Sequence, residues 1–303
     1  MAARAGLIDR EDARISSRHE EAALGLAAAL PRLLVAARRA SATVVHGLHG
    51  RRRSGVGENF WQFRRFTEGD PTTRIDWRKS ARDEHVYIRE QEWEAAHTVW
   101  LWIDRSRSMA YRSSLSEVSK LDRAVVLGLA LADVLVRGGE RVGLLGLTRP
   151  TASRLAIDKL AQSLAFAADD ASHLPPAGAP IARLAEAVLI GDLLAPEEEI
   201  AAAVANLAGR GGRGHMVMIV DPIEETFPFT GRTEFLDPDA PLKLVAGRAE
   251  DWRSGYEERL ARHRAALAEI ARRFGWTFTI HRTDRPATEP LLALHARLGE
   301  AHG

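Results

Sequence analysis

The chain contains no cysteine, which excludes disulfides, thiolate metal centres and cysteine nucleophiles. This absence is consistent with a reducing compartment. Lysine is also scarce, because the 42 basic side chains include only Lys79, Lys120, Lys159 and Lys243. Acidic side chains number 41, so the formal net charge is +1. No global field therefore draws the chain to nucleic acid or to an anionic membrane.

Long hydrophobic runs are missing as well. The most apolar early stretch, Ala22–Ala37, is interrupted by Pro31 and Arg32 and is too short to span a bilayer. Acidic residues precede it, whereas a secretory signal begins with a basic region followed by an apolar core. We therefore expect a cytoplasmic protein. Its 303 residues, 46% of them hydrophobic, suffice for one large domain or two modest ones.

Three regions of different composition follow one another along the chain. Residues 1–45 contain many good helix formers and predict an N-terminal helical arm. Residues 46–97 are dense in Gly, Arg, Asp and aromatic side chains, and Val86-Tyr87-Ile88 predicts a short strand among them. From residue 98 to residue 303, short apolar stretches alternate with helical patterns.

The alternation in the third region predicts the fold class. Strands are expected at 99–103, 141–147, 187–190, 216–220 and 276–280, and helices at 121–136, 157–168, 196–207, 251–274 and 290–298. Ser114-x-x-Glu117 has the pattern of a capping box before the first of these helices. The Pro and Gly residues of 223–249 predict loops with a hairpin. Repeated strand–helix units are typical of an α/β, Rossmann-like, mainly parallel sheet with helices on both faces.

The most informative motif follows the apolar run Val99–Ile103. Asp104-Arg-Ser106-Arg-Ser108 places three oxygen-bearing side chains in one loop at the end of a predicted strand. Hard divalent cations such as Mg²⁺ prefer oxygen ligands of this kind. The spacing resembles the metal-ion-dependent adhesion site of von Willebrand factor A-like domains. The alternative is a strand-to-helix turn in which Asp and Ser only cap backbone N–H groups.

Two more predicted strands end in aspartate, at Asp192 and Asp221. Ligands of open parallel sheets bind outside the carboxyl ends of the strands, so Asp104 and these two aspartates are expected at one edge. Clustered carboxylates repel one another, and a bound cation would relieve the repulsion. For Asp104 with its serines we favour metal binding, and for Asp221, which precedes Pro222, we favour capping. For Asp192 both interpretations stay open.

Linked motifs at Gly69–Arg82, Val86–Glu90 and Asp104–Met109 make a more specific pattern, which continues to Thr283–Pro286. Over roughly residues 45–300 the chain resembles the bacterial family called domain of unknown function fifty-eight. The resemblance implies a von Willebrand factor A-like core. It also implies association with MoxR-type AAA+ ATPases and with other von Willebrand factor A-like proteins. The implied role is that of an adaptor that binds protein partners, not that of an enzyme.

The resemblance to the adhesion site implies that Mg²⁺ is held by Asp104, Ser106, Ser108 and Asp192. The adhesion site usually adds a loop threonine, expected here at Gly178-Ala179, where the chain has none. Thr148 and Thr151 are the nearest candidates, and Thr148 is the one we retain in the ligand set. Gly191 also stands where a serine is common. An open position on the ion could accept a carboxylate from a partner protein.

Two other functions are kept as alternatives. A metal-dependent hydrolase would use Asp104, Asp192 and Asp221. A nucleic-acid binder would use residues 51–82, with arginines on phosphates and aromatic rings on bases. Acidic residues interleave with those arginines and offer them bidentate partners, which favours a structural or protein-interaction role for the segment.

Overall fold

The computed structural model describes residues 26–45, 60–67, 70, 72–91, 97–167, 173–178, 185–209, 212–239 and 242–300. After a helix over 26–45, the elements are β1 (Phe60–Arg65), η1 (Thr72–Arg74), α2 (Trp77–Ser80), β2 (Tyr87–Gln91), β3 (Thr98–Ile103), η2 (Arg107–Ala110), α3 (Lys120–Arg137), β4 (Arg141–Leu144), α4 (Ala156–Phe166), β5 (Glu186–Gly191), α5 (Glu197–Ala208), β6 (Arg213–Val220), α6 (Pro222–Thr226), β7 (Thr233–Leu236), β8 (Lys243–Ala246), η3 (Ala249–Trp252), α7 (Arg253–Arg273), β9 (Thr277–Arg282) and α8 (Thr288–Glu300).

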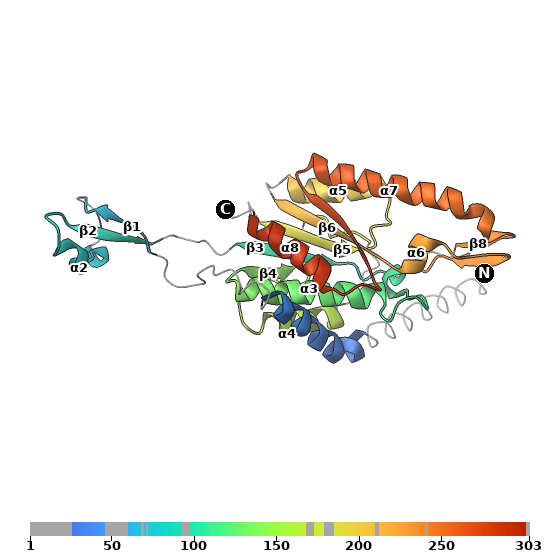
Figure 1. Ribbon diagram of the computed structural model, residues 1–303, viewed down its shortest axis with the longest axis horizontal. Helices are drawn as coiled ribbons and strands as arrows, with labels where there is room; N and C mark the ends of the chain where they lie inside the picture. Colours follow the sequence, from blue (N-terminus) through green and yellow to red (C-terminus); the bar gives the residue numbers. More distant parts are fainter. Residues whose placement is uncertain are drawn as a thin grey trace, which may run out of the picture.

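A five-stranded sheet forms the centre of the body, in the order β4-β3-β5-β6-β9, and every neighbouring pair is parallel (Figure 1). The helices between the strands cross over its two faces, as parallel connections require. This arrangement confirms the predicted fold class, a mainly parallel α/β sheet covered by helices on both sides.

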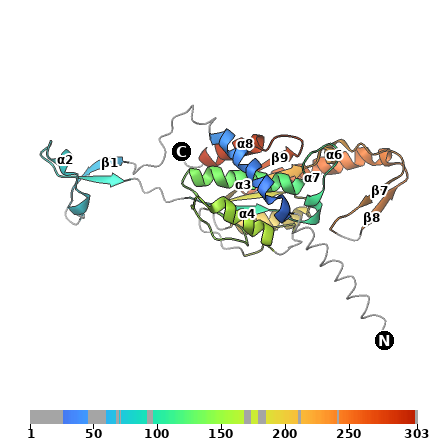
Figure 2. The same cartoon turned by 90° about the horizontal axis from the view of Figure 1, so that it is seen from below.

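Side-chain alternation along β3 shows how the two faces are filled. Val99, Leu101 and Ile103 belong to one buried cluster, which includes side chains of α3, α4 and α8. Trp100 and Trp102 belong to the other, under α5 and α7. Successive side chains of a strand point to opposite faces, so a strand that is apolar throughout is buried on both sides. Figures 1 and 2 show the two helical layers on either side of the sheet.

The helix over 26–45 packs on the first helical layer, beside α3 (Figure 2). Leu33 and Ala37 are buried there, and the Ser41 hydroxyl donates a hydrogen bond to the buried carboxylate of Asp133 on α3. The apolar face of the predicted arm therefore docks on the body. The part of that arm before residue 26 lies outside the described residues.

The Arg- and aromatic-rich segment forms a small unit of its own, in which β1 pairs antiparallel with β2 and stands apart from the central sheet in Figure 1. Asp76 caps α2 by accepting a hydrogen bond from the Lys79 amide at 2.8 Å. The Lys79 ammonium lies over the rings of Phe63 and Tyr87. The sequence predicted only the strand near residues 86–88. In β1, consecutive aromatic and arginine residues obscure the alternation of apolar and polar side chains that is typical of a strand.

Three local details differ from the expected pattern. Ser119, and not Ser114, caps α3, since its hydroxyl accepts a hydrogen bond from the Asp122 amide at 3.0 Å. The strand expected to reach residue 147 ends at Leu144, because Gly146 turns the chain with φ 76°. The region 223–249 contains the expected hairpin, β7 with β8, and also the short helix α6.

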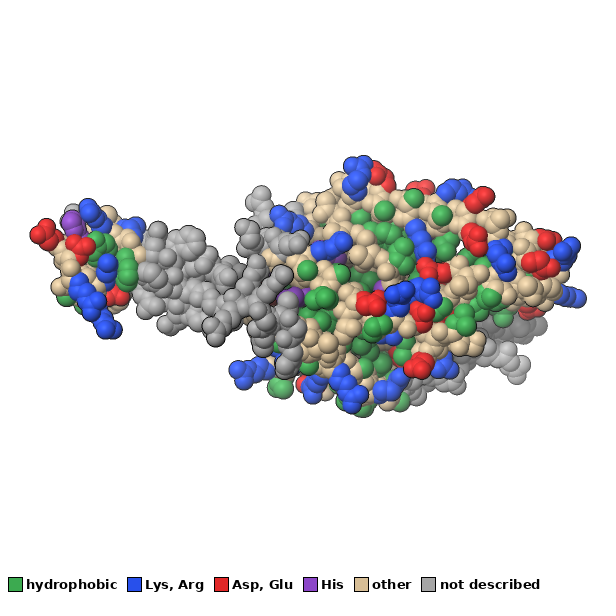
Figure 3. All heavy atoms as spheres, viewed as in Figure 1, with side chains coloured by type: hydrophobic (Ala, Val, Ile, Leu, Met, Phe, Trp, Pro, Cys, Tyr) green, Lys and Arg blue, Asp and Glu red, His purple; other side chains and the backbone are tan. Residues whose placement is uncertain are grey.

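Charged side chains of both signs are interspersed over the face of the body shown in Figure 3, as a net charge of +1 suggests. None of the described helices combines the length and the hydropathy needed to cross a membrane.

Candidate functional site

The strand order places a topological switch point between β3 and β5. From β3 the chain crosses to β4 on one side, and the later strands then add in sequence on the other side. Crevices at such points, outside the carboxyl ends of the strands, are where open α/β sheets bind ligands. Asp104 directly follows β3, and Asp192 directly follows β5. The Asp104 amide continues the ladder by donating to the Ile190 carbonyl at 2.9 Å.

Asp104 is fully buried, and its two carboxylate oxygens differ. Oδ1 accepts a hydrogen bond from the Ser106 amide at 2.8 Å. Oδ2 has no hydrogen-bond partner among the described residues. Burial, followed by the charge of Asp192, raises the pKa of Asp104 to about 6, although hydrogen bonds from Ser106 oppose the rise. Either a proton or a bound cation would therefore stabilise this buried carboxylate.

Gly191 creates the space that Asp104 fills. A Cβ on residue 191 would lie 2.7 Å from the Asp104 Cβ and 3.0 Å from its Oδ2. A serine here would therefore displace the aspartate. The departure from the adhesion-site pattern at this position thus has a steric reason in this chain.

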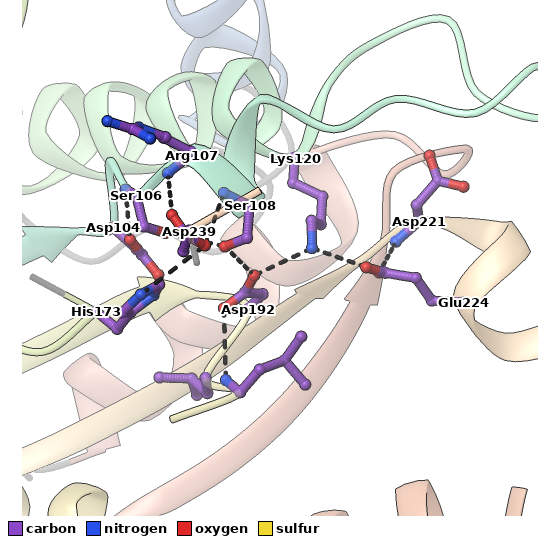
Figure 4. Close-up of polar contacts among 12 residues, drawn as sticks. Asp104, Ser106, Arg107, Ser108, Lys120, His173, Asp192, Asp221, Glu224 and Asp239 are labelled. Carbon is purple, nitrogen blue, oxygen red and sulfur yellow. Dashed lines mark hydrogen bonds and ion pairs between the residues drawn. The ribbon is translucent and has the colours of Figure 1, made fainter. Parts of the chain in front are cut away.

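The serines connect the two aspartates (Figure 4). The hydroxyls of Ser106 and Ser108 lie 3.0 Å apart, and the Ser108 hydroxyl donates to Asp192 Oδ2 at 2.7 Å. The structure therefore brings together four of the five predicted ligand residues, and we call Asp104, Ser106, Ser108 and Asp192 the rim site. The Thr148 hydroxyl is used elsewhere, because it accepts a hydrogen bond from the Leu144 amide at 2.9 Å in the turn after β4.

Asp192 is held from its backbone as well as from the serine. The residue after it, Leu193, has φ 51°, a conformation that non-glycine residues adopt infrequently. The Leu193 side chain is buried, and its carbonyl lies 2.7 Å from His263 Nε2 of α7. Packing under α7 thus keeps a strained turn in place directly behind the Asp192 carboxylate.

Lys120 is the most important residue that the sequence did not predict. It is the first residue of α3, is 1% exposed, and donates to Asp192 Oδ2 at 3.1 Å and to Glu224 Oε1 at 2.8 Å. Burial by itself would lower the pKa of Lys120, but the two carboxylates outweigh burial and raise it. The ammonium is therefore a fixed positive charge beside the rim site. Lysine is scarce in this arginine-rich chain, and this scarcity was the available sequence signal for Lys120.

Asp239 is the second unpredicted residue. It lies in the connection between β7 and β8, yet its carboxylate accepts hydrogen bonds from the amides of Arg107 at 2.9 Å and Ser108 at 3.2 Å. His173 Nε2 lies 3.8 Å from the same carboxylate. Figure 4 shows Asp239 beside the serines of the rim site. Separated from Ser108 by 131 positions, it offers no sequence signal for this contact.

Asp221 lies at the end of β6 but is used as a cap, which agrees with the interpretation favoured from the sequence. Its carboxylate accepts hydrogen bonds from the Ser113 amide at 2.9 Å, from the Ser113 hydroxyl, and from the Ile223 amide at 3.0 Å. Glu224 completes a capping box by accepting from the Asp221 amide at 2.7 Å. Because Glu224 also binds Lys120, this cap is connected to the rim site.

The donor set of the rim site suits a hard cation. All of its side-chain ligand atoms are oxygens, one of them is a buried and unpaired carboxylate oxygen, and such ligands match Mg²⁺. Within the described ranges, no three carboxylate or imidazole side chains converge on one metal position. The serine hydroxyls or water would therefore have to complete the coordination. The Lys120 ammonium already places one positive charge beside Asp192. Asp104 has no hydrogen bond to this ammonium, and its Oδ2 has no partner among the described residues.

Comparison with known proteins identifies related sequences of unknown function. The family model described as "Protein of unknown function DUF58" matches residues 62–266. Uncharacterized proteins of Mycobacterium bovis and of two strains of Mycobacterium tuberculosis are 27% identical over 278 residues, covering 86% of this chain and 86% of each relative. A crystal structure of the conserved hypothetical protein BatB from Bacteroides thetaiotaomicron has a TM-score of 0.40 and 14% identity, covering 68% of this chain and 100% of that chain.

Proposed function

The chain belongs to the DUF58 family, and on this premise we propose that it is a non-catalytic protein-interaction module. In this proposal the rim site binds a divalent cation such as Mg²⁺, and a partner protein docks at or near it. The domain is then a von Willebrand factor A-like adaptor whose adhesion-type site lies at the carboxyl edge of the sheet.

The observation that carries the proposal is the unpaired Oδ2 of Asp104. A carboxylate oxygen that is buried without a partner is costly, and each such atom in a native structure calls for an explanation. Asp192 and the hydroxyls of Ser106 and Ser108 lie beside it, so the oxygens that a hard cation requires are already assembled. When bound, Mg²⁺ would balance the two aspartates and offer a coordination position to a carboxylate from outside.

The chain's own residues would then divide the work. Asp104 and the two serines would hold the ion from one loop, and Asp192 would hold it from the neighbouring strand end. Lys120 would orient the Asp192 carboxylate by its hydrogen bond to Oδ2. Thr148 is not needed in this set, because its hydroxyl is already bonded to the Leu144 amide.

The proposed partner is a MoxR-type AAA+ ATPase, together with other von Willebrand factor A-like proteins, as the family resemblance implies.

The hydrolase alternative is less well supported. It requires Asp104, Asp192 and Asp221 to act together, but Asp221 already accepts three hydrogen bonds as a helix cap. The nucleic-acid alternative depends on residues 51–82, of which residues 51–59 lie outside the described part of the chain. Within the described part, Arg64 pairs with Asp70 at 2.8 Å, as expected for a structural role.

Calorimetric titration with Mg²⁺ tests the metal site. We expect wild type to bind, Asp104→Ala to lose the binding heat, and Asp284→Ala, an aspartate paired with Arg282 on the surface, to behave as wild type. Identical heats for wild type and Asp104→Ala would contradict the metal site. Capture of a purified MoxR-type ATPase from the same genome, with Mg²⁺ or with a chelator, then tests the adaptor role. Capture that is equal under both conditions would contradict metal-dependent docking.

A further inference from the structure

We propose that the β7–β8 hairpin is an internal competitor for the rim site, because Asp239 holds the place that an acidic side chain of a partner protein must take. This inference rests on the proposed function, since it concerns how docking at the same site is controlled. Its physical basis is the contact between Asp239 and the loop that carries the two serines.

In this contact, backbone amides of the rim loop bind a carboxylate, as they would bind an acidic side chain of a partner. Each oxygen of the Asp239 carboxylate accepts one backbone hydrogen bond, from Arg107 and from Ser108. Hydrogen bonds to an ionised acceptor are stronger than neutral ones. The carboxylate comes from a distant segment and arrives beside the Ser108 hydroxyl, which itself donates to Asp192. At these two amides, an acidic side chain from another protein would therefore compete with Asp239.

The hairpin is held in place by aromatic contacts of β7 as well as by Asp239. The Phe235 ring stacks between Phe227 and Trp252, with ring centres 5.8 and 6.0 Å away. At the tip, the Asp239 amide donates to the Asp237 carboxylate at 2.9 Å, which shapes the turn locally. A two-stranded sheet has little stability of its own. Release of Asp239 from the rim would therefore leave the aromatic contacts of Phe235 in place.

The two strands of the hairpin and their connecting loop also carry apolar side chains that are not buried. Relative exposures are 67% for Leu236, 55% for Leu242, 51% for Leu244 and 45% for Val245. Exposed apolar groups that cluster on one element often mark interaction surfaces. A partner that inserts an acidic side chain at the rim would meet this hairpin next to it. The partner surface we infer is therefore an acidic loop with apolar neighbours.

The local charges limit how tightly Asp239 is held. Asp104 and Asp192 lie at the same rim and repel a third carboxylate, and Lys120 is already bonded to Asp192 and Glu224. His173 Nε2, 3.8 Å from the Asp239 carboxylate, attracts it only when the imidazole is protonated. Because Asp239 is tethered, it is nonetheless present at a high effective concentration. A partner carboxylate thus competes with a weak but intramolecular ligand. Removing Asp239 should open the site to external carboxylates.

Nuclear magnetic resonance of the full chain tests this competition with acetate as the probe, the simplest carboxylate. In Asp239→Ala we expect acetate to shift the amide signals of Arg107 and Ser108 at concentrations at least about tenfold below those needed in wild type. That factor corresponds to 1.4 kcal/mol of lost intramolecular binding. Asp239→Asn, which keeps one neutral acceptor, should give an intermediate response. Glu234→Gln, which removes only the hairpin ion pair with Lys243, should respond as wild type.

Equal acetate responses in wild type and Asp239→Ala would overturn the competitor proposal, and so would an absent response in both. The Mg²⁺ titration is read separately. If Asp239→Ala gains acetate binding while neither protein binds Mg²⁺, the metal site fails and the internal competition stands. If Mg²⁺ binds to both but the acetate responses are equal, the metal site stands and the competition fails.

Discussion

Replacing Asp104 with asparagine should stabilise the metal-free protein at neutral pH. Burial and Asp192 raise the pKa of Asp104 from 3.8 to about 6, so the folded state holds the proton more tightly than the unfolded state does. The free energy of unfolding therefore falls as the pH rises from about 4 to about 6. Above this interval the buried charge costs on the order of 3 kcal/mol. Asparagine carries no charge and avoids this cost, while its oxygen can still accept the Ser106 amide.

The assay is urea or thermal unfolding of wild type and Asp104→Asn between pH 4 and pH 8 with a chelator present. The stability of the two proteins should be similar near pH 4. Above pH 6 we expect Asp104→Asn to be more stable by up to about 3 kcal/mol, which for a chain of this size is roughly 5 °C in Tm. Adding Mg²⁺ should stabilise wild type and leave the variant unchanged, because a ligand that binds only the folded state stabilises it.

Asp284→Asn is the matched control, because Asp284 is exposed and its pKa is lowered, first of all by the hydrogen bond from Arg282. Asp284 therefore contributes to the free energy of unfolding with the opposite sign. Its stabilising contribution is present above the ordinary pKa of an aspartate and is lost as the pH falls. A stability difference between Asp104→Asn and wild type that does not change with pH would refute the argument. A variant less stable than wild type at pH 7.5 would refute it as well.

Three further substitutions probe the groups around Asp104. Lys120→Met should lower the free energy of unfolding in urea by about 3–5 kcal/mol, because it leaves the buried carboxylate of Asp192 and the partly buried carboxylate of Glu224 without their ammonium. Gly191→Ala should lower it by about 1–3 kcal/mol and weaken Mg²⁺ binding in calorimetry, since the new Cβ would meet Asp104, whereas Gly255→Ala, with open space around it, should not. Asp221→Ala should cost about 1–3 kcal/mol through its lost cap but leave the Mg²⁺ heats unchanged.

Local patterns were sufficient to predict most of the fold. The strands β3, β5 and β6 are apolar because both faces of a parallel sheet are covered, and such runs are visible in a single sequence. The convergence of Asp104 and Asp192 followed from the same pattern, because parallel strands end at one edge. The separate strand β1 was missed, since its alternation is masked by adjacent aromatic and arginine residues.

The missing parts of the site are long-range contacts that no local pattern encodes. Lys120 stands out in the sequence only as one of four lysines, and only the fold shows that it reaches Asp192 and Glu224. Asp239 sits in an acidic hairpin turn that resembles any solvent-exposed loop. The prediction of a capping box at Ser114-x-x-Glu117 was wrong for a related reason. Residues 112–119 form turns that carry Ser113 to Asp221, so α3 starts five residues later than that box implies.

The hydrogen-bond partners of the three aspartates bear on whether the rim has a structural or a binding role. If the carboxylates only capped loops, each would find its partners within the chain, as Asp221 does with Ser113 and Ile223. Asp192 is also satisfied, by Ser108 and Lys120. Asp104 differs, because one of its oxygens is buried without any partner in the described chain, and Gly191 preserves the space beside it. A cap leaves no oxygen without a partner, so the unpaired oxygen of Asp104 is the feature that supports our proposal of a cation at the rim.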